Sequence, residues 1–156
     1  MRDKFLFSDA QAFASLSAVG AISEHIWDLE EDVVADQAIQ GCLMVQITAA
    51  SLVTGLTEGI ILSLRVDDAV GLATAQNGSN AGYKEIASKH ILKEEIVAGK
   101  VFAVPVYDVI SARAKYMGFW PKAKSTAESG GGILTFEAYF VESVDDSINR
   151  VQKKPV

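Results

Sequence analysis

Residues 129–141 read SGGGILTFEAYFV, and this stretch decides the fold class that the sequence predicts. Every second residue from Leu134 to Phe140 is apolar, and a polar or amphipathic residue stands between each two of them. Such a period of two places the apolar side chains on one face of a β-strand. The three glycines at 130–132 disfavour a helix and suit a loop that enters the strand. Residues 133–141 therefore predict a strand with one buried face.

The same kind of pattern recurs along the chain. Residues 60–66 also alternate, and residues 42–52, 101–107 and 112–120 are rich in apolar, β-branched or aromatic side chains. Pro105 lacks an N–H donor and so predicts an edge strand or a bulge within 101–107. Several short strands joined by loops favour a β-sandwich or a barrel.

Signals for helices are weaker. Residues 8–16 predict a short helix capped by Ser8 or Asp9, because alanines at alternate positions are good helix formers. The apolar residues within 85–97 do not form a single stripe, so extended structure is favoured there. Residues 77–80, NGSN, have the composition of a surface loop tip.

Length and composition predict one packed domain. The chain has 156 residues, of which 49% are hydrophobic, and its 14 basic and 20 acidic residues give a net charge of −6. This balance argues against nucleic acid as a partner. We expect a β-sandwich domain at 21–146, an N-terminal arm at 1–20 and a C-terminal tail at 147–156. The apolar arm would either cross onto a neighbouring subunit or pack on its own sandwich.

The sequence predicts folding in a reducing compartment and no membrane partner. Cys42 is the single cysteine, so no intramolecular disulfide is available. The N-terminus lacks the long apolar stretch of a signal peptide, which favours the cytoplasm. Residues 37–57 carry no charge and match the length of a membrane span, but polar residues interrupt them and no basic residues flank them. A buried strand followed by a turn fits this stretch better.

No catalytic constellation is visible, and we expect neither enzyme activity nor a cofactor. Only His25 and His90 are available as general bases, and no Gly-x-Ser-x-Gly elbow occurs. One cysteine and two separated histidines do not build a zinc site, and Cys42 is best interpreted as a buried, inert thiol. Acidic pairs such as Asp67-Asp68 and Asp145-Asp146 leave a bound divalent ion open, although solvated acids are the simpler interpretation.

Two features point instead to interactions with other proteins. Residues 24–36 contain six acidic side chains and no Lys or Arg, which is typical of an exposed acidic segment. The mean hydropathy of +0.21 is high for a small monomer, and apolar residues of such domains are often buried in subunit contacts. An oligomer or a component of a larger assembly is therefore expected.

The order of these landmarks resembles the capsid cement proteins of tailed bacteriophages. The resemblance is carried by the opening FSDAQA at 7–12, the strand at 60–68 and IVAGKVFAVPV at 96–106. It continues with the aromatic KYMGFW at 115–120 and the glycine-rich entry into 133–141. It spans nearly the whole chain but rests on a pattern of strands, because the family has no catalytic motif.

The resemblance implies a single-domain, jelly-roll-like β-sandwich that decorates the outside of an icosahedral shell. Such a protein would be made in the host cytoplasm and would stabilise the virion by bridging neighbouring subunits of the major capsid protein, commonly as a homotrimer. The resemblance implies no enzyme activity and no cofactor.

From the residues themselves, candidate capsid or subunit contacts are two aromatic side chains of the arm and three acidic side chains of the 24–36 segment. They are Phe5, Phe7, Asp28, Glu30 and Glu31. Two other functions stay open, a tail-associated virion protein and a carbohydrate-binding jelly-roll module. The second would present an exposed aromatic platform, for which the candidates are Trp27, Tyr83, Tyr116, Trp120 and Tyr139.

Overall fold

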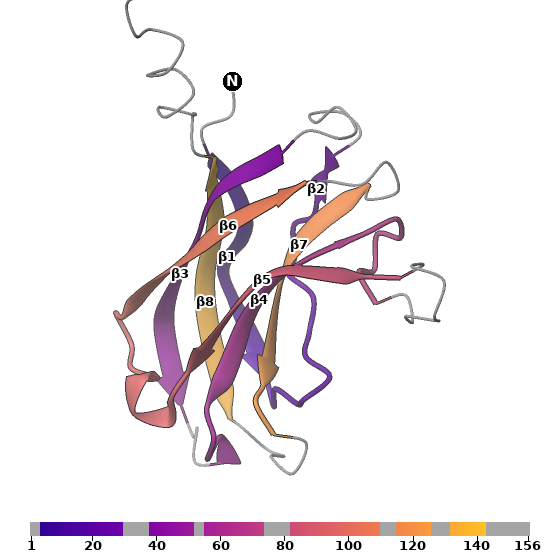
Figure 1. Ribbon diagram of the computed structural model, residues 1–156. Coiled ribbons are helices and arrows are strands. Elements are labelled where there is room, and N and C mark those ends of the chain that lie inside the picture. The colour runs from indigo at the N-terminus through magenta and orange to yellow at the C-terminus, as the bar shows by residue number, and fades with distance from the viewer. Residues whose placement is uncertain are drawn as a thin grey trace, which may run out of the picture.

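The computed structural model describes residues 4–29, 38–51, 55–73, 82–109, 115–125 and 132–142. Two four-stranded antiparallel sheets pack face to face, as Figure 1 shows, so the predicted all-β sandwich is confirmed. The first sheet has the order β1 (Lys4–Ala14), β8 (Ile133–Glu142), β3 (Ala38–Ser51) and β6 (Val101–Val109). The second has the order β2 (Trp27–Asp28), β7 (Tyr116–Ala123), β4 (Ile60–Asp67) and β5 (Lys84–Ile91).

The strand order is that of a jelly roll. Strands pair from the outside of the chain inwards, β1 with β8, β2 with β7, β3 with β6 and β4 with β5. Two further pairings, β3 with β8 and β4 with β7, join these pairs into the two sheets. An eight-stranded antiparallel sandwich with this connectivity contains the two Greek keys of the jelly-roll architecture.

Alternation along the strands builds the core between the sheets. In β8, Leu134, Phe136, Ala138 and Phe140 are all buried, as the period of two predicts. Rings from both sheets meet there, and Phe136 lies 5.6 Å from Phe119 in an edge-to-face arrangement. Each fully buried side chain of this size contributes about 1.5 to 3 kcal/mol of hydrophobic stabilisation.

The main strand predictions are confirmed with small shifts in their ends. Residues 42–52 lie mostly in β3, 60–66 in β4 and 101–107 in β6, whereas the strand expected at 112–120 is β7, which begins at Tyr116. β6 is an edge strand, as Pro105 indicates. The extended structure favoured for residues 85–97 is β5, followed by the short 3₁₀ helix η2 (Lys93–Glu95). The loop tip predicted at 77–80 lies outside the described residues.

The helix predicted at residues 8–16 is wrong, because most of this segment belongs to strand β1. Pairing with β8 outweighs the helix propensity of its alanines, and two register shifts interrupt its alternation. Ala10, with φ of 52°, lies in one of these irregular stretches. The segment expected to form an N-terminal arm therefore contains a strand that packs on its own sandwich.

The uncharged stretch at 37–57 contains strand β3. Within the described ranges there is no helix whose length and hydropathy would let it span a membrane.

The outward side of the β2-β7-β4-β5 sheet is partly closed. Ser63, Arg65 and Asp67 point away from the core of the sandwich, yet each is at most 4% exposed. Residues from neighbouring turns and strands enclose this side, and Leu72 is fully buried against Gly118. This sheet thus carries a small second layer of side chains on its outside.

Candidate interaction surface

The β1-β8-β3-β6 sheet presents a side to solvent that is built from cross-strand rows of side chains. One row crosses all four strands through Leu6, Tyr139, Met44 and Ala103. The neighbouring rows follow from the same register, and we call the whole set the outer face. Among residues whose side chains the structure describes, it consists of Leu6, Gln40, Cys42, Met44, Gln46, Val101, Ala103, Pro105, Tyr107, Glu137, Tyr139 and Val141. By register, Lys4 occupies the β1 end of the row that contains Val141, Cys42 and Pro105.

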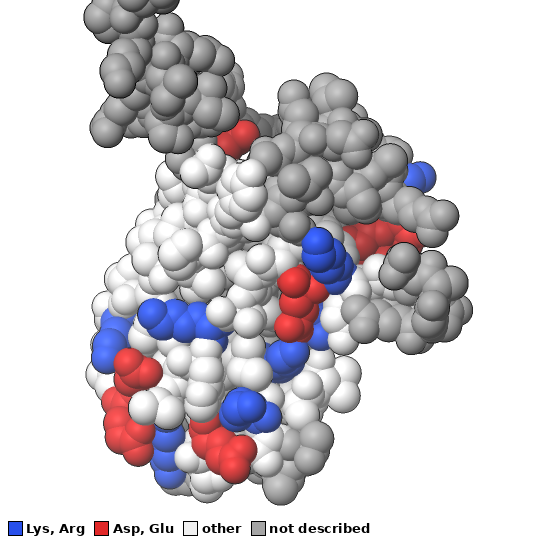
Figure 2. Space-filling model, viewed as in Figure 1, with Lys and Arg blue, Asp and Glu red and all other residues white. Residues whose placement is uncertain are grey.

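The outer face is poor in charge and rich in exposed apolar atoms. Tyr107 is 68% exposed and Val101 is 51% exposed, while Glu137 is the one charged member of the set. Figure 2 shows the surface over β6 largely free of Lys, Arg, Asp and Glu, and charges of both signs gather towards the end where η2 lies. Contiguous apolar surface of this kind marks interaction sites on soluble proteins.

Strand β6 shows why the sequence produces this surface. Its inward residues Phe102, Val104 and Val106 are buried, and the residues between them are also apolar or aromatic. A strand with one solvated face normally alternates with polar residues. The strand is therefore apolar on both sides, and burial in the core accounts for only one of them.

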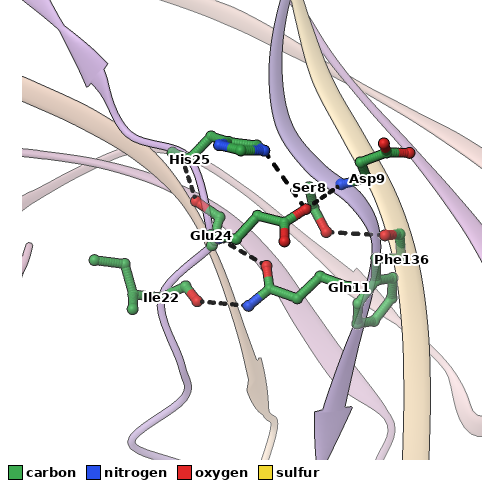
Figure 3. A network of polar contacts seen from close by, with 8 residues as sticks. Ser8, Asp9, Gln11, Ile22, Glu24, His25 and Phe136 are labelled. Atoms are coloured by element: carbon green, nitrogen blue, oxygen red, sulfur yellow. Dashed lines mark hydrogen bonds and ion pairs between the residues drawn. The ribbon is translucent and has the colours of Figure 1, made fainter.

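The free edge of β1 is covered by a segment of the same chain, as Figure 3 shows. The Gln11 side chain donates to the carbonyl of Ile22 at 3.2 Å and accepts from the amide of Glu24 at 2.7 Å. A carboxylate oxygen of Glu24 accepts from the Asp9 amide at 2.7 Å, and the His25 amide donates to the Phe7 carbonyl at 3.0 Å. These bonds occupy backbone groups that an added strand would need.

The other edge of this sheet is also protected. Pro105 in the middle of β6 has no N–H, and β6 lies beside β5 of the opposite sheet. A partner that extends the sheet by strand addition would therefore be disfavoured at both edges, whereas the outer face itself stays open.

Cys42 is half-buried on this face. Its sulfur lies 3.7 Å from the Met44 sulfur, and burial raises the pKa of the thiol, partly offset by a hydrogen bond with the Val104 backbone. A protonated thiol is a weak nucleophile, so the geometry agrees with the interpretation of Cys42 as an inert group.

The predicted contact residues fall into different environments. Phe7 is fully buried in the core, so the prediction that its side chain is a surface contact is wrong. Phe5 is half-buried and stacks on Trp27 with ring centres 5.3 Å apart. Asp28 is half-buried in the edge strand β2, and Glu30 and Glu31 lie outside the described residues. Of the described candidates, Phe5 thus lies against Trp27, which precedes Asp28 in β2, whereas Phe7 lies in the core.

The aromatic platform predicted for a carbohydrate-binding module is not formed by the two tryptophans. Trp27 is 4% and Trp120 is 5% exposed, and Tyr83 packs on the guanidinium of Arg65. Tyr116 and Tyr139 are half-buried, the latter on the outer face. Tyr107, which is the most exposed aromatic residue of that face, was not singled out from the sequence although its outward position in β6 follows from the alternation.

Both histidines and Asp67 are engaged in contacts within the chain. Nε2 of His90 lies 2.6 Å from the Glu58 carbonyl, and His25 lies 3.7 Å from the Glu24 carboxylate at an exposed position. Asp67 is 2% exposed and accepts from the Asp68 amide, so the interpretation of Asp67 as a solvated acid is wrong. In the described ranges no three His, Cys, Asp or Glu side chains gather in a way that would hold a metal ion. Asp145 and Asp146 lie outside those ranges.

Comparison with known proteins adds a distant likeness in fold. No protein-family model matches the chain, and no curated protein matches it in sequence. Among solved structures, the CBM22-1-GH10 modules of an endo-1,4-β-D-xylanase from Clostridium thermocellum, complexed with xylohexaose, align with a TM-score of 0.41 and 8% identity. The alignment covers 88% of this chain and 26% of the xylanase chain. At that level of similarity it carries no argument about function.

Proposed function

We propose that this protein is a structural virion protein that binds the outside of an icosahedral phage capsid and stabilises it by bridging neighbouring subunits of the major capsid protein. The order of sequence landmarks supports this proposal, because it resembles that of phage cement proteins. The jelly-roll strand order agrees with the fold that the resemblance implies.

The outer face is the observation that carries the proposal. A cement protein that acts as linked copies needs a surface that binds protein, and the most distinctive described surface is a charge-poor sheet face suited to this. Both edges of that sheet are protected, so a partner would meet the face and leave the core pairing intact.

Cementing follows from repeated modest contacts. Copies that are linked to one another raise the effective concentration of each copy at the neighbouring capsid site. A protein that binds the assembled shell and not its dissociated subunits shifts the equilibrium towards the shell by mass action. An interface between copies, provided by an apolar face, would therefore strengthen the attachment of every copy.

We assign the acidic segment that the sequence analysis identified to contact with the shell. It contains Asp28 at the edge strand β2 together with Glu30 and Glu31. Contacts made by exposed carboxylates weaken as salt screens them, so shell binding is expected to fall as the ionic strength rises.

Co-sedimentation with undecorated phage shells tests the proposed function. The wild-type protein should pellet with the shells, and reversal of the three acidic residues to lysine should reduce the pelleted fraction most at low salt. A matched control reverses three acidic residues elsewhere, so that the net charge changes equally. These are Glu58, Glu94 and Glu142. Wild-type protein that stays in the supernatant at every salt concentration would contradict the proposal, and binding to polysaccharides without shell binding would favour the carbohydrate-binding alternative.

A further inference from the structure

We propose that the outer face binds the same face of a second copy of this chain, which gives a two-fold symmetric dimer with the two β1-β8-β3-β6 sheets packed against each other. This dimer names the partner of the outer face and so deepens the proposed function. Only the biological role of the dimer rests on the proposed function. The contact itself follows from the composition, extent and charge of the face.

Composition favours a second copy over the capsid as the occupant. The central row of the outer face is apolar or aromatic and consists of Leu6, Tyr139, Met44 and Ala103. The polar residues lie away from it, with Gln46 and Glu137 on the next row and Gln40 near the opposite end of the face. Interfaces between identical subunits are more apolar than interfaces between proteins that also exist apart. A shell that awaits decoration exposes its surface to water, so its docking partner is expected to meet it with polar groups.

The extent of the face suits a small interface between two copies that associate reversibly. The outer face spans seven residues of β3, Gln40 to Gln46, and the seven residues of β6 opposite them. Four strands at the usual spacing and about seven residues of length give a face of roughly 19 Å by 23 Å, or about 440 Å². Two such faces bury about 880 Å² in projection, and the accessible area of a rough surface exceeds its projection, so the contact lies near the lower limit of about 1,000 to 1,200 Å² for specific interfaces.

Shape also suits a packing of sheet on sheet. Large side chains such as Tyr139 and Met44 stand beside the small Ala103 and Cys42, so the rows of two copies are able to interdigitate. Because the face meets itself, the contact is isologous and closes with two copies. The dimer therefore differs from the trimer that the family resemblance implies.

The charge of the chain restricts where two copies meet. Each copy carries a net charge of −6, so two copies repel each other. The repulsion opposes association least when the contact surface itself contains few carboxylates. The outer face meets this condition, since Glu137 is its one carboxylate and the other charged residue that the register places in its rows is the basic Lys4. Salt that screens the repulsion should strengthen the dimer, whereas the same salt should weaken shell binding by the acidic segment.

Sedimentation equilibrium of the full chain over a range of concentrations tests the dimer. The expected mass is twice 16.7 kDa, with tighter association at higher salt. Ala103→Glu places a carboxylate in the central row of the face, at the exposed β6 end of that row, and the dimer would bury it twice. We expect dissociation to rise by at least about 100-fold, which corresponds to about 1.4 kcal/mol for each carboxylate.

Two further variants keep the test decisive. Ala69→Glu makes the same change at an exposed turn after β4 and should leave the dimer intact. Val101→Glu repeats the disruption at a second exposed site of the face, in case Ala103→Glu unfolds. Cys42 provides an independent readout, because a bulky maleimide should react faster with it once the face is freed.

Several outcomes would overturn the dimer and leave the proposed function standing. They are a trimer, a monomer at all concentrations, or a dimer that survives both glutamates on the face while the same protein still pellets with shells. Conversely, a dimer that dissociates as expected but never pellets with shells would support the interface and contradict the cement function.

Discussion

The guanidinium of Arg65 lies 4.0 Å from the centre of the Trp120 ring, and both residues are at most 5% exposed. The ring of Tyr83 lies 3.7 Å away from the same guanidinium, so the cation is held between two aromatic rings. Burial lowers the pKa of Arg65, while Tyr83, Glu85 and Asp67 act in the opposite direction. Glu85 lies 3.6 Å from Arg65 and also binds Lys122, so this cluster joins β4, β5 and β7 on the outside of their sheet.

Replacing Arg65 is expected to destabilise the fold. Arg65→Ala removes both ring contacts and a bond to the Leu72 carbonyl, and it should cost about 2 to 3 kcal/mol, because Glu85 keeps Lys122 as a partner and is partly solvated. Arg65→Lys keeps the charge but loses the planar group, and it should cost about 1 to 2 kcal/mol. Urea unfolding followed by tryptophan fluorescence measures both values.

An exposed ion pair provides the comparison for that experiment. Lys100 and Glu95 lie 3.9 Å apart with both side chains more than a third exposed. Lys100→Ala should therefore change the free energy of unfolding by less than about 0.5 kcal/mol. Equal effects of the two alanine variants would contradict the role assigned to burial of Arg65.

Alanine substitutions at three glycines should distinguish the cost in stability of a positive φ from the cost of a steric clash. Gly59 has a φ of +85°, and a Cβ there would collide with the Ile91 carbonyl, so Gly59→Ala should cost about 3 kcal/mol. Gly99 has a φ of +92° but open surroundings, so Gly99→Ala should cost about 1 kcal/mol. Gly71 has neither constraint, and Gly71→Ala should change stability by less than about 0.5 kcal/mol. Thermal unfolding of the three variants checks this order, and a Gly71 variant as unstable as the Gly59 variant would refute it.

Strand patterns in the sequence identified most of the sandwich because burial on one face imposes a period of two, as in β8 and β4. β1 was mistaken for a helix because its alternation breaks near Ala10, and only its pairing with β8 explains why it is extended. A local pattern carries no information about a strand more than a hundred residues away. The exact partner of each strand therefore came from the structure.

The bonds that cover the edge of β1 should be measurable through Gln11. Gln11→Ala removes its two bonds to the 22–24 segment and should cost about 1 to 2 kcal/mol. The backbone amides of Asp9 and Glu24 should then exchange hydrogen faster, because the segment no longer lies fixed along the strand. Asp9→Ala is the control, since the Asp9 amide that bonds to Glu24 is retained. Unchanged exchange in the Gln11 variant would show that the segment is held by other contacts.

Titration of the Cys42 thiol should follow its burial. Because the pKa in the folded state is raised, the folded protein keeps the thiol proton where the unfolded chain loses it. Stability should therefore fall as the pH rises through the ordinary cysteine value and beyond. Alkylation by iodoacetamide should show a midpoint above that value in native buffer and return to it in concentrated urea. Cys42→Ser serves as the unreactive control, and a native midpoint below the urea midpoint would contradict the burial effect.

The outer face was beyond sequence analysis for a different reason. Leu6, Met44 and Tyr139 come from three distant segments, and only the register of β1, β3 and β8 places them in one row. One signal was available, because residues 101–107 are apolar at nearly every position and so exceed what one buried face needs. The acidic segment was visible directly, since its members are close in sequence.

The position of β8 has a consequence for synthesis. This strand lies between β1 and β3, so the first sheet has a vacant centre until residue 142 has left the ribosome. The edges of β1 and β3 that pair with β8 keep unpaired backbone groups while the rest of the chain is translated. Translation takes several seconds at about 5 to 20 residues per second. Chaperone binding to the nascent chain is expected to be strongest during this interval and to end when the last strand inserts.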